Sequence, residues 1–220
     1  MSFAFPRVYP ILDVSAIPQT GRERFLKELG EGLTEAGVTL LEYRNKTGDE
    51  WELIADAGVL RQSLPAEKVK LILDDRADLI EKLQFDGVHV DSGDVTPANA
   101  RWLLHPHHII GTFGGSESLL EGILSEPADY FSIGPVFASS TKQTPRGPIG
   151  VDGVRKLRQE AGPDPVLVAV GGITLETAPA VLAAGATTVA VSAAIFRTDD
   201  PVAEFRRWMA ELNEQPIESS

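Results

Sequence analysis

Residues 166–174, Val166-Leu167-Val168-Ala169-Val170-Gly171-Gly172-Ile173-Thr174, join an uninterrupted apolar run to a pair of glycines. A short continuous apolar run of this kind predicts a parallel β-strand that is buried on both faces. The glycines end the run, and a helical pattern follows them. We therefore expect an α/β protein in which buried strands alternate with helices.

The same alternation extends over nearly the whole chain. Thr96-Pro97 and Asp200-Pro201 are typical helix starts, and Gly37 is a typical helix end. Apolar stripes predict further helices near residues 79–83 and 119–124. Eight strands are expected between the helices, at residues 8–12, 38–43, 68–73, 87–90, 108–112, 130–133, 166–170 and 188–192.

Eight parallel strands in one series predict a single (β/α)8 TIM barrel. We expect one domain over residues 1–213 and a polar, frayed tail at residues 214–220. An open, doubly wound sheet is the alternative, and it would normally carry a glycine-rich phosphate loop after its first strand. Leu12-Asp13-Val14-Ser15 contains no glycine, so the barrel is favoured.

The composition limits the classes of protein and ligand. The chain has 220 residues, no cysteine and a formal net charge of −12. Strong acidity argues against a general nucleic-acid or membrane surface, and the lack of cysteine excludes disulfides, zinc thiolates and cysteine nucleophiles. No apolar run is long enough to span a membrane, and residues 1–10 lack the pattern of a signal peptide. We expect a soluble, cytoplasmic protein that holds any phosphate ligand in a local site.

The carboxyl ends of the strands carry the ligand site in a TIM barrel, so the residues there are the candidates. The second strand ends in Glu42-Tyr43-Arg44-Asn45-Lys46. Alternation places Glu42, Arg44 and Lys46 on one side, and two cations there suit a phosphate or diphosphate. An ordinary solvated strand end is the alternative.

Acidic residues follow the third and fourth strands. Asp74 and Asp75 could bind Mg²⁺, which takes oxygen ligands, or Asp75 could cap the next helix. A carboxylate in Asp91-Ser92-Gly93-Asp94 could complete the metal site, or these residues could form a turn. The sequence leaves both pairs of interpretations open.

Two later segments have features of anion sites. Residues 137–147 combine hydroxyl groups with Lys142, which suits a diphosphate clamp, although a mobile polar loop has the same composition. Gly171 and Gly172 follow the seventh strand and Ser192 ends the eighth, where many (β/α)8 enzymes bind phosphate. This second segment is the strongest signal for a binding site.

Histidine and tryptophan give weaker signals. His89 lies on the fourth strand, where it could be either a core residue or a catalytic one. The other histidines are expected at the surface, and the tryptophans are expected to pack against the core: His105, His107 and His108, and Trp51, Trp102 and Trp208.

In combination, the motifs resemble those of thiamine phosphate synthase, and the resemblance covers nearly the whole chain. The matching motifs are Tyr43-Arg44-x-Lys46, Asp74-Asp75-Arg76, Asp86-Gly87-Val88-His89, Gly134-Pro135-Val136-Phe137, Thr141-Lys142, Gly171-Gly172-Ile173 and Val191-Ser192. Related thiazole tautomerases share the barrel and several motifs, and the presence of Thr141-Lys142 favours the synthase.

The resemblance implies that a hydroxymethylpyrimidine diphosphate and a thiazole phosphate give thiamine phosphate and pyrophosphate, with Mg²⁺ as cofactor. The diphosphate would leave first, and the thiazole nitrogen would attack the resulting cation. Apolar helices outside a barrel are also compatible with a homodimer. The implied roles are Arg44, Lys46 and Lys142 as catalytic cations, Ser139 and Thr141 as diphosphate contacts, Asp75 and Asp94 as Mg²⁺ ligands, Gly172 and Ser192 as thiazole-phosphate contacts, and Glu42, Asp74, Gly171 and Val191 as further substrate-binding residues.

The chain departs from the family pattern on the pyrimidine-diphosphate side. Glu42 replaces a glutamine, Asp74 an asparagine and Phe113 a serine, and Asp91-Ser92 replaces Gly-Gln. Negative charge beside a diphosphate repels it unless a metal or a proton compensates. Three functions therefore stay open: the synthase, a thiazole tautomerase-like isomerase with His89 as its acid–base residue, and a non-catalytic relative that binds thiazole phosphate.

Overall fold

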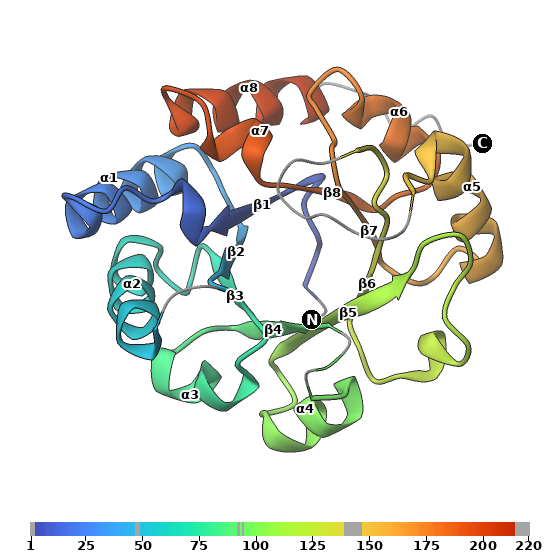
Figure 1. The fold of residues 1–220 in the computed structure, drawn as a ribbon, viewed down its shortest axis with the longest axis horizontal. Coiled ribbons are helices and arrows are strands. Elements are labelled where there is room, and N and C mark those ends of the chain that lie inside the picture. The colour runs from blue at the N-terminus through green and yellow to red at the C-terminus, as the bar shows by residue number, and fades with distance from the viewer. Residues whose placement is uncertain (1–2, 47–48, 92, 94, 139–146, 214–220) are drawn as a thin grey trace.

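A computed structural model describes residues 3–46, 49–91, 93, 95–138 and 147–213. In this part of the chain, parallel strands close into a barrel in chain order, and β8 pairs with β1 (Figure 1). The strands are β1 (Val8–Asp13), β2 (Leu40–Arg44), β3 (Lys70–Asp74), β4 (Gly87–Val90), β5 (Ile109–Gly115), β6 (Tyr130–Ile133), β7 (Leu167–Val170) and β8 (Thr188–Val191). The predicted single (β/α)8 barrel is confirmed, although several strand ends are shifted.

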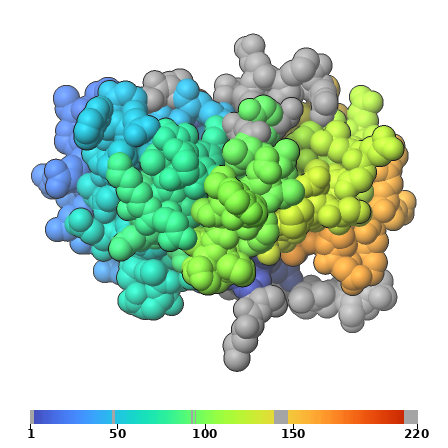
Figure 2. All heavy atoms as spheres, turned by 90° about the horizontal axis from the view of Figure 1, so that it is seen from below, coloured from blue at the N-terminus to red at the C-terminus, as the bar shows by residue number. Residues whose placement is uncertain are grey.

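Helices surround the barrel and return the chain from the end of one strand to the start of the next (Figure 1). They are the α-helices α1 (Arg22–Glu35), α2 (Glu50–Ser63), α3 (Ile80–Leu83), α4 (Pro97–Leu103), α5 (Gly150–Ala161), α6 (Ala178–Ala183), α7 (Ala193–Phe196) and α8 (Pro201–Asn213), and the 3₁₀ helices η1 (Val14–Ala16), η2 (Ala77–Leu79) and η3 (Ile123–Ser125). Figure 2 shows the side of the molecule that α2, α3 and α4 cover. Within the described residues, no helix is both long enough and apolar enough to cross a membrane.

A small apolar cluster fills the inside of the barrel toward the amino-terminal ends of its strands. Phe3 and Phe5 pack against this cluster, and the Phe5 ring lies edge-on to Tyr130 with 5.5 Å between ring centroids. The segment that leads into β1 accordingly crosses the middle of the barrel in Figure 1. The cluster consists of Tyr9, Leu40, Ile72, Ile109, Tyr130, Val168 and Ala190.

Local capping signals hold in the structure. Thr96 caps α4 by accepting a hydrogen bond from the Asn99 amide, and Asp200 accepts one from the Ala203 amide at the start of α8. Gly37 follows α1 with a φ of 85°, in the left-handed region that glycine tolerates. The ends of these helices are therefore dictated by adjacent residues.

The predicted helix near residues 119–124 is wrong. The segment instead makes an isolated bridge between Gly115 and Leu119 and then the short η3. Gly122 has a φ of 70°, which breaks a right-handed helix in the middle of the apolar stripe. The stripe has the period of a helix, but it contains too few residues on either side of this glycine to form one.

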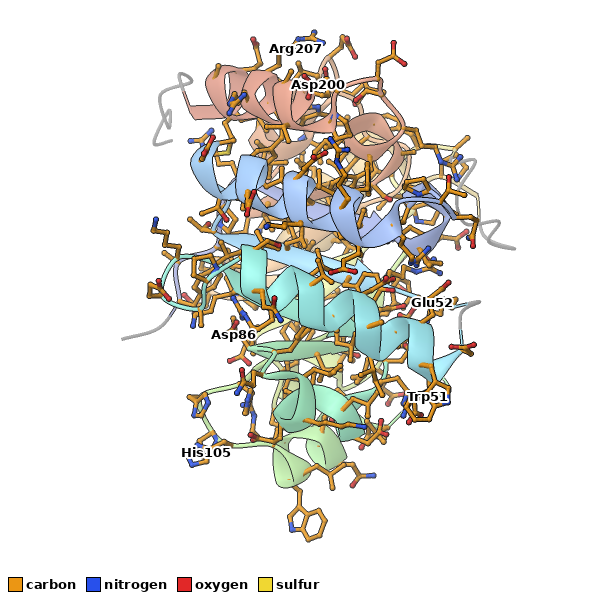
Figure 3. All side chains as sticks on the ribbon, turned by 90° about the vertical axis from the view of Figure 1, so that its left-hand side faces the viewer. Trp51, Glu52, Asp86, His105, Asp200 and Arg207 are labelled. Atoms are coloured by element: carbon orange, nitrogen blue, oxygen red, sulfur yellow. The ribbon has the colours of Figure 1, made fainter. Side chains whose placement is uncertain are left out.

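Two expectations about aromatic residues also fail. Trp51 and Trp102 are 82% and 85% exposed, whereas Trp208 is buried as expected. His108, expected at the surface, is only 5% exposed. Figure 3 shows Trp51 at the start of α2 and His105 in the turn after α4, both at the edge of the molecule. Hydrophobic character alone did not indicate which helix face turns inward.

Candidate active site

A cavity of about 700 Å³ opens at the carboxyl ends of the strands. Residues from the ends of β1, β2, β3 and β4 form one side of its wall, and residues after β6, β7 and β8 form the other. Ligand cavities commonly have volumes in this range. The structure thus brings together strand ends that are far apart in the sequence.

The second strand presents alternate side chains to the cavity, as its pattern predicts. Glu42 and Arg44 line the cavity, whereas the Tyr43 hydroxyl on the other face donates a hydrogen bond of 2.5 Å to Asp56. Asp56 also accepts two hydrogen bonds from Arg22 at the start of α1. This outward network joins β2 to α1 and α2 and lies on the opposite face of the strand from the side chains that line the cavity.

The two cations at and just after the end of β2, Arg44 and Lys46, lie among carboxylates. Arg44 Nη1 donates to Asp13 Oδ2, and Arg44 Nε lies 3.4 Å from Asp74 Oδ2. Lys46 Nζ lies 3.2 Å from Asp74 Oδ2 and donates to Asp75 Oδ2. Burial lowers the pKa of Lys46, but its bonds to these carboxylates outweigh burial and raise it, so it stays charged. Of these two predicted cations, Arg44 lines the cavity, whereas Lys46 is not among the lining residues and lies beside it through the shared contact with Asp74.

Asp75 does not cap the following helix, so that alternative is wrong. The next helical segment, η2, begins only after Arg76. Asp75 itself has a φ of 69°, which is uncommon outside glycine and is often found at functional sites. Its carboxylate stands beside Lys46 at the end of β3, where an oxygen ligand for a cation was predicted.

The opposite wall is built from glycines and strand ends. Gly171, Gly172, Val191 and Ser192 all line the cavity, as predicted. Gly172 has a φ of 62°, and a Cβ added there would lie 2.4 Å from the carbonyl oxygen of Ala138. The backbone of this wall therefore packs too tightly for a side chain at Gly172, and it presents main-chain groups to the cavity.

Four predicted site residues lie outside the described part of the chain. These are Asp94, Ser139, Thr141 and Lys142. Ser92, which belongs to the Asp91-Ser92 pair that replaces the family's Gly-Gln, also lies outside it. The predicted tail at residues 214–220 is also outside the described residues.

Several cavity residues were missed as binding candidates. Asp13 ends β1 and could have been found by the strand-end rule that identified Arg44. Tyr9 and Tyr130 lie near the beginnings of their strands, where that rule does not look. His89 and Phe113 both line the cavity, which places His89 inside the barrel as its alternation allowed.

Glu42 is the most perturbed acid of the site. It is 4% exposed and accepts a hydrogen bond of 2.8 Å from the Tyr9 hydroxyl. Burial raises the pKa of Glu42 to about 7, and the nearby Asp74 adds to the shift. Burial also raises the pKa of Asp74. Glu42, one of the two acids that depart from the family pattern, thus carries less negative charge near neutral pH than an exposed acid would.

A family model described as thiamine monophosphate synthase matches residues 8–195, which contain every strand of the barrel. The chain belongs to this family. It is 39% identical over 188 residues to the thiamine-phosphate synthase of Koribacter versatilis, covering 86% of this chain and 88% of the relative. It is also 39% identical over 175 residues to the thiamine-phosphate synthase of Agrobacterium fabrum, covering 78% and 80% of the two chains.

A solved thiamine phosphate pyrophosphorylase has the same fold. The thiamine phosphate pyrophosphorylase from Pyrococcus furiosus superposes with a TM-score of 0.76 at 27% identity, covering 94% of this chain and 96% of that one. The family resemblance inferred from the motifs is therefore confirmed. The isomerase and the non-catalytic binder are not favoured, because the relatives above carry the name of the synthase or pyrophosphorylase.

Proposed function

We propose that the protein is a thiamine-phosphate synthase, a transferase that joins hydroxymethylpyrimidine diphosphate and thiazole phosphate with release of pyrophosphate. One observation carries the proposal: Arg44 at the end of β2 and a glycine wall after β7 and β8 line the same cavity. Each of the two suits one phosphorylated substrate. A reaction between two such substrates needs both at one reacting centre.

The cationic residues would hold the diphosphate. Arg44 and Lys46, with Lys142, would stabilise the negative charge that grows on the leaving group as its C–O bond breaks. The electron pair of that bond leaves with the diphosphate, which becomes pyrophosphate. Ser139 and Thr141 would add contacts from the same stretch of sequence as Lys142. Glu42 and Asp74 would complete the binding of this substrate from β2 and β3.

The glycine wall would hold the thiazole phosphate. Main-chain groups at Gly171, Gly172 and Val191, together with Ser192, would contact the phosphate and aim the thiazole nitrogen at the pyrimidine methylene carbon. The nitrogen lone pair forms the new C–N bond. Because that nitrogen is neutral and carries no proton, the step needs no general base.

Mg²⁺ is the proposed cofactor, with Asp75 and Asp94 as its ligands. Asp75 fits this role because it directly follows β3 and its carboxylate contacts Lys46, one of the cations that would hold the diphosphate. Mg²⁺ is often bound through one or two carboxylates plus substrate phosphates, so a dedicated cage of side chains is not required. When bound, the ion would neutralise charge on the diphosphate.

The cellular setting is also a proposal. The net charge of −12 argues against nucleic acid and membranes as partners, and a biosynthetic enzyme of this kind would act in the cytoplasm on small molecules. A homodimer is compatible with the barrel.

Steady-state kinetics of single variants test the assignment of Arg44. Arg44→Ala should lower kcat/KM for the pyrimidine diphosphate by about 10²–10³-fold and leave the KM for thiazole phosphate nearly unchanged. Arg24→Ala is the matched control, because Arg24 is exposed on α1 and pairs only locally with Glu28. Equal kinetics for Arg44→Ala and Arg24→Ala would contradict the assignment.

A further inference from the structure

A continuous chain of polar side chains crosses the inside of the barrel at the floor of the cavity. The Tyr9 hydroxyl donates to Glu42 Oε2 at 2.8 Å and lies 3.1 Å from the Tyr130 hydroxyl. The Tyr130 hydroxyl lies 3.0 Å from His89 Nδ1, and His89 Nε2 lies 3.7 Å from Asp91 Oδ1. All five residues line the cavity, and they come from β1, β2, β4, β6 and the turn after β4.

Because each hydroxyl group has one proton, all hydrogen bonds along this chain must run in the same direction at any one time, and two directions are possible. Each tyrosine has one proton, so when Tyr9 donates to Glu42, Tyr130 must donate to Tyr9 and His89 Nδ1–H to Tyr130. In the opposite direction, protonated Glu42 donates to Tyr9, Tyr9 to Tyr130, and Tyr130 to His89 Nδ1. Both arrangements satisfy every group.

The two arrangements can hold the same number of protons. In the first, Glu42 is a carboxylate and His89 is protonated on both ring nitrogens. In the second, Glu42 is a carboxylic acid and His89 is neutral with its proton on Nε2, facing Asp91. Three protons each move across one hydrogen bond between the two, from His89 to Tyr130, from Tyr130 to Tyr9 and from Tyr9 to Glu42. No proton enters or leaves the protein.

Burial makes this exchange relevant near neutral pH. Burial raises the pKa of Glu42 to about 7. Burial lowers the pKa of His89, but the contact with Asp91 and the charge of Glu42 outweigh it and raise that pKa overall. The charged and titratable groups that face Glu42 from the surrounding strands are Tyr9, Arg44, Asp74, His89 and Tyr130.

We propose that Tyr9, Tyr130 and His89 are positioning residues that relay a proton to and from Glu42, so that the Glu42 carboxyl can present either an acceptor or a donor to a ring at the cavity floor. The ligand class is a nitrogen heterocycle with donor and acceptor groups on its edge. This inference rests on the proposed function for the identity of that ring, but the relay itself is a property of the ligand-free protein.

Difference infrared spectroscopy of the ligand-free protein reads the relay directly. The carbonyl band of protonated Glu42, identified by its loss in Glu42→Gln, should titrate near neutral pH. Tyr9→Phe and Tyr130→Phe each remove one oxygen atom, and both should shift the midpoint upward, because Tyr9 donates to the carboxylate and Tyr130 in turn donates to Tyr9 when it does so. Tyr43→Phe is the matched control, since the Tyr43 hydroxyl faces Asp56 on the other side of β2. A midpoint that Tyr130→Phe leaves unmoved would overturn the relay.

Calorimetry extends the test to the ligand. Hydroxymethylpyrimidine diphosphate is titrated into the protein near neutral pH, in two buffers with different heats of ionisation, to count the protons exchanged on binding. Tyr130→Phe and Glu42→Gln should change this number relative to wild type, and Tyr43→Phe should not. An identical number in all four proteins would contradict a role of the relay in recognition. The infrared shifts together with no thiamine phosphate formation would overturn the proposed function and leave the relay standing.

Discussion

Asp13 and Arg44 lie opposite each other in the register of β1 and β2, and the Arg44 guanidinium donates to the Asp13 carboxylate. The other Asp13 oxygen accepts bonds from the amide and hydroxyl of Ser15, at 3.0 and 2.5 Å. Burial raises the pKa of Asp13, but the bonds from Ser15 and Arg44 outweigh burial and lower it. Asp13, which is itself held by Ser15, thus positions Arg44, the cation that we assign to the diphosphate.

Asp13→Asn should therefore distinguish an effect on the orientation of Arg44 from an effect on the affinity for pyrophosphate. The variant keeps the size of the side chain but loosens Arg44, and we expect kcat to fall by about tenfold to a hundredfold, as for small displacements of catalytic groups. Removing a negative charge should leave pyrophosphate inhibition unchanged or stronger. Inhibition constants and kcat are measured together, with Asp152→Asn on the exposed side of α5 as control. Weaker inhibition with an unchanged kcat would argue against a positioning role.

Glu42→Gln should flatten the pH dependence of stability. The pKa of Glu42 is raised to about 7 in the folded protein from an ordinary value of 4.5, so the folded state holds its proton more tightly than the unfolded chain. The resulting stabilisation is complete below about pH 4.5 and is lost as pH rises through about 7, by up to about 3 kcal/mol. Urea unfolding from pH 5 to 8 should show this loss in wild type and in Glu67→Gln, an exposed control, but not in Glu42→Gln. If the free energy of unfolding depends on pH in the same way in all three proteins, Glu42 is not the source of this loss.

Asp56→Ala should destabilise the fold but leave the rate of the reaction nearly unchanged. Asp56 is buried and accepts from Arg22 Nε at 2.7 Å, from Arg22 Nη2 at 2.5 Å and from the Tyr43 hydroxyl at 2.5 Å. Removing it breaks these three hydrogen bonds and leaves the mostly buried Arg22 guanidinium with the Glu52 carboxylate, 3.3 Å away, as its partner, at a cost of about 3 kcal/mol. Urea unfolding measures the loss, and activity per folded molecule should stay near wild type. A loss of less than about 1 kcal/mol would show that the network contributes little.

Gly172→Ala should damage the glycine wall. The φ of 62° and the contact of 2.4 Å with the Ala138 carbonyl oxygen leave no room for a Cβ. We expect a loss of about 1–3 kcal/mol in stability together with a raised KM for thiazole phosphate. Gly58→Ala within α2 is the control, because a Cβ there meets nothing within 4 Å, and it should be neutral or stabilising by up to about 1 kcal/mol. Wild-type binding by Gly172→Ala would show that thiazole phosphate does not contact this wall.

The barrel could be predicted because its signals are local. The apolar run of β7, the cap at Thr96 and the left-handed Gly37 each act on adjacent residues, and eight repeats of such signals specify one topology. The same locality explains the error at residues 119–124, where a single glycine outweighs an apolar stripe.

Half of the site could be predicted for a related reason. Arg44, Asp75 and Ser192 end their strands or follow them, so the barrel topology alone brings them to one end. The Tyr9–Tyr130 contact could not be predicted, because it joins residues 121 positions apart whose meeting depends on closure of the barrel. The raised pKa of Glu42 follows from the same enclosure.

Formation of thiamine phosphate by the wild-type protein tests the central claim most directly. The purified protein is mixed with hydroxymethylpyrimidine diphosphate, thiazole phosphate and Mg²⁺, and both thiamine phosphate and pyrophosphate are measured. The account predicts equal amounts of the two products, and their loss when a chelator is added. Folded protein that binds thiazole phosphate yet forms neither product would contradict it.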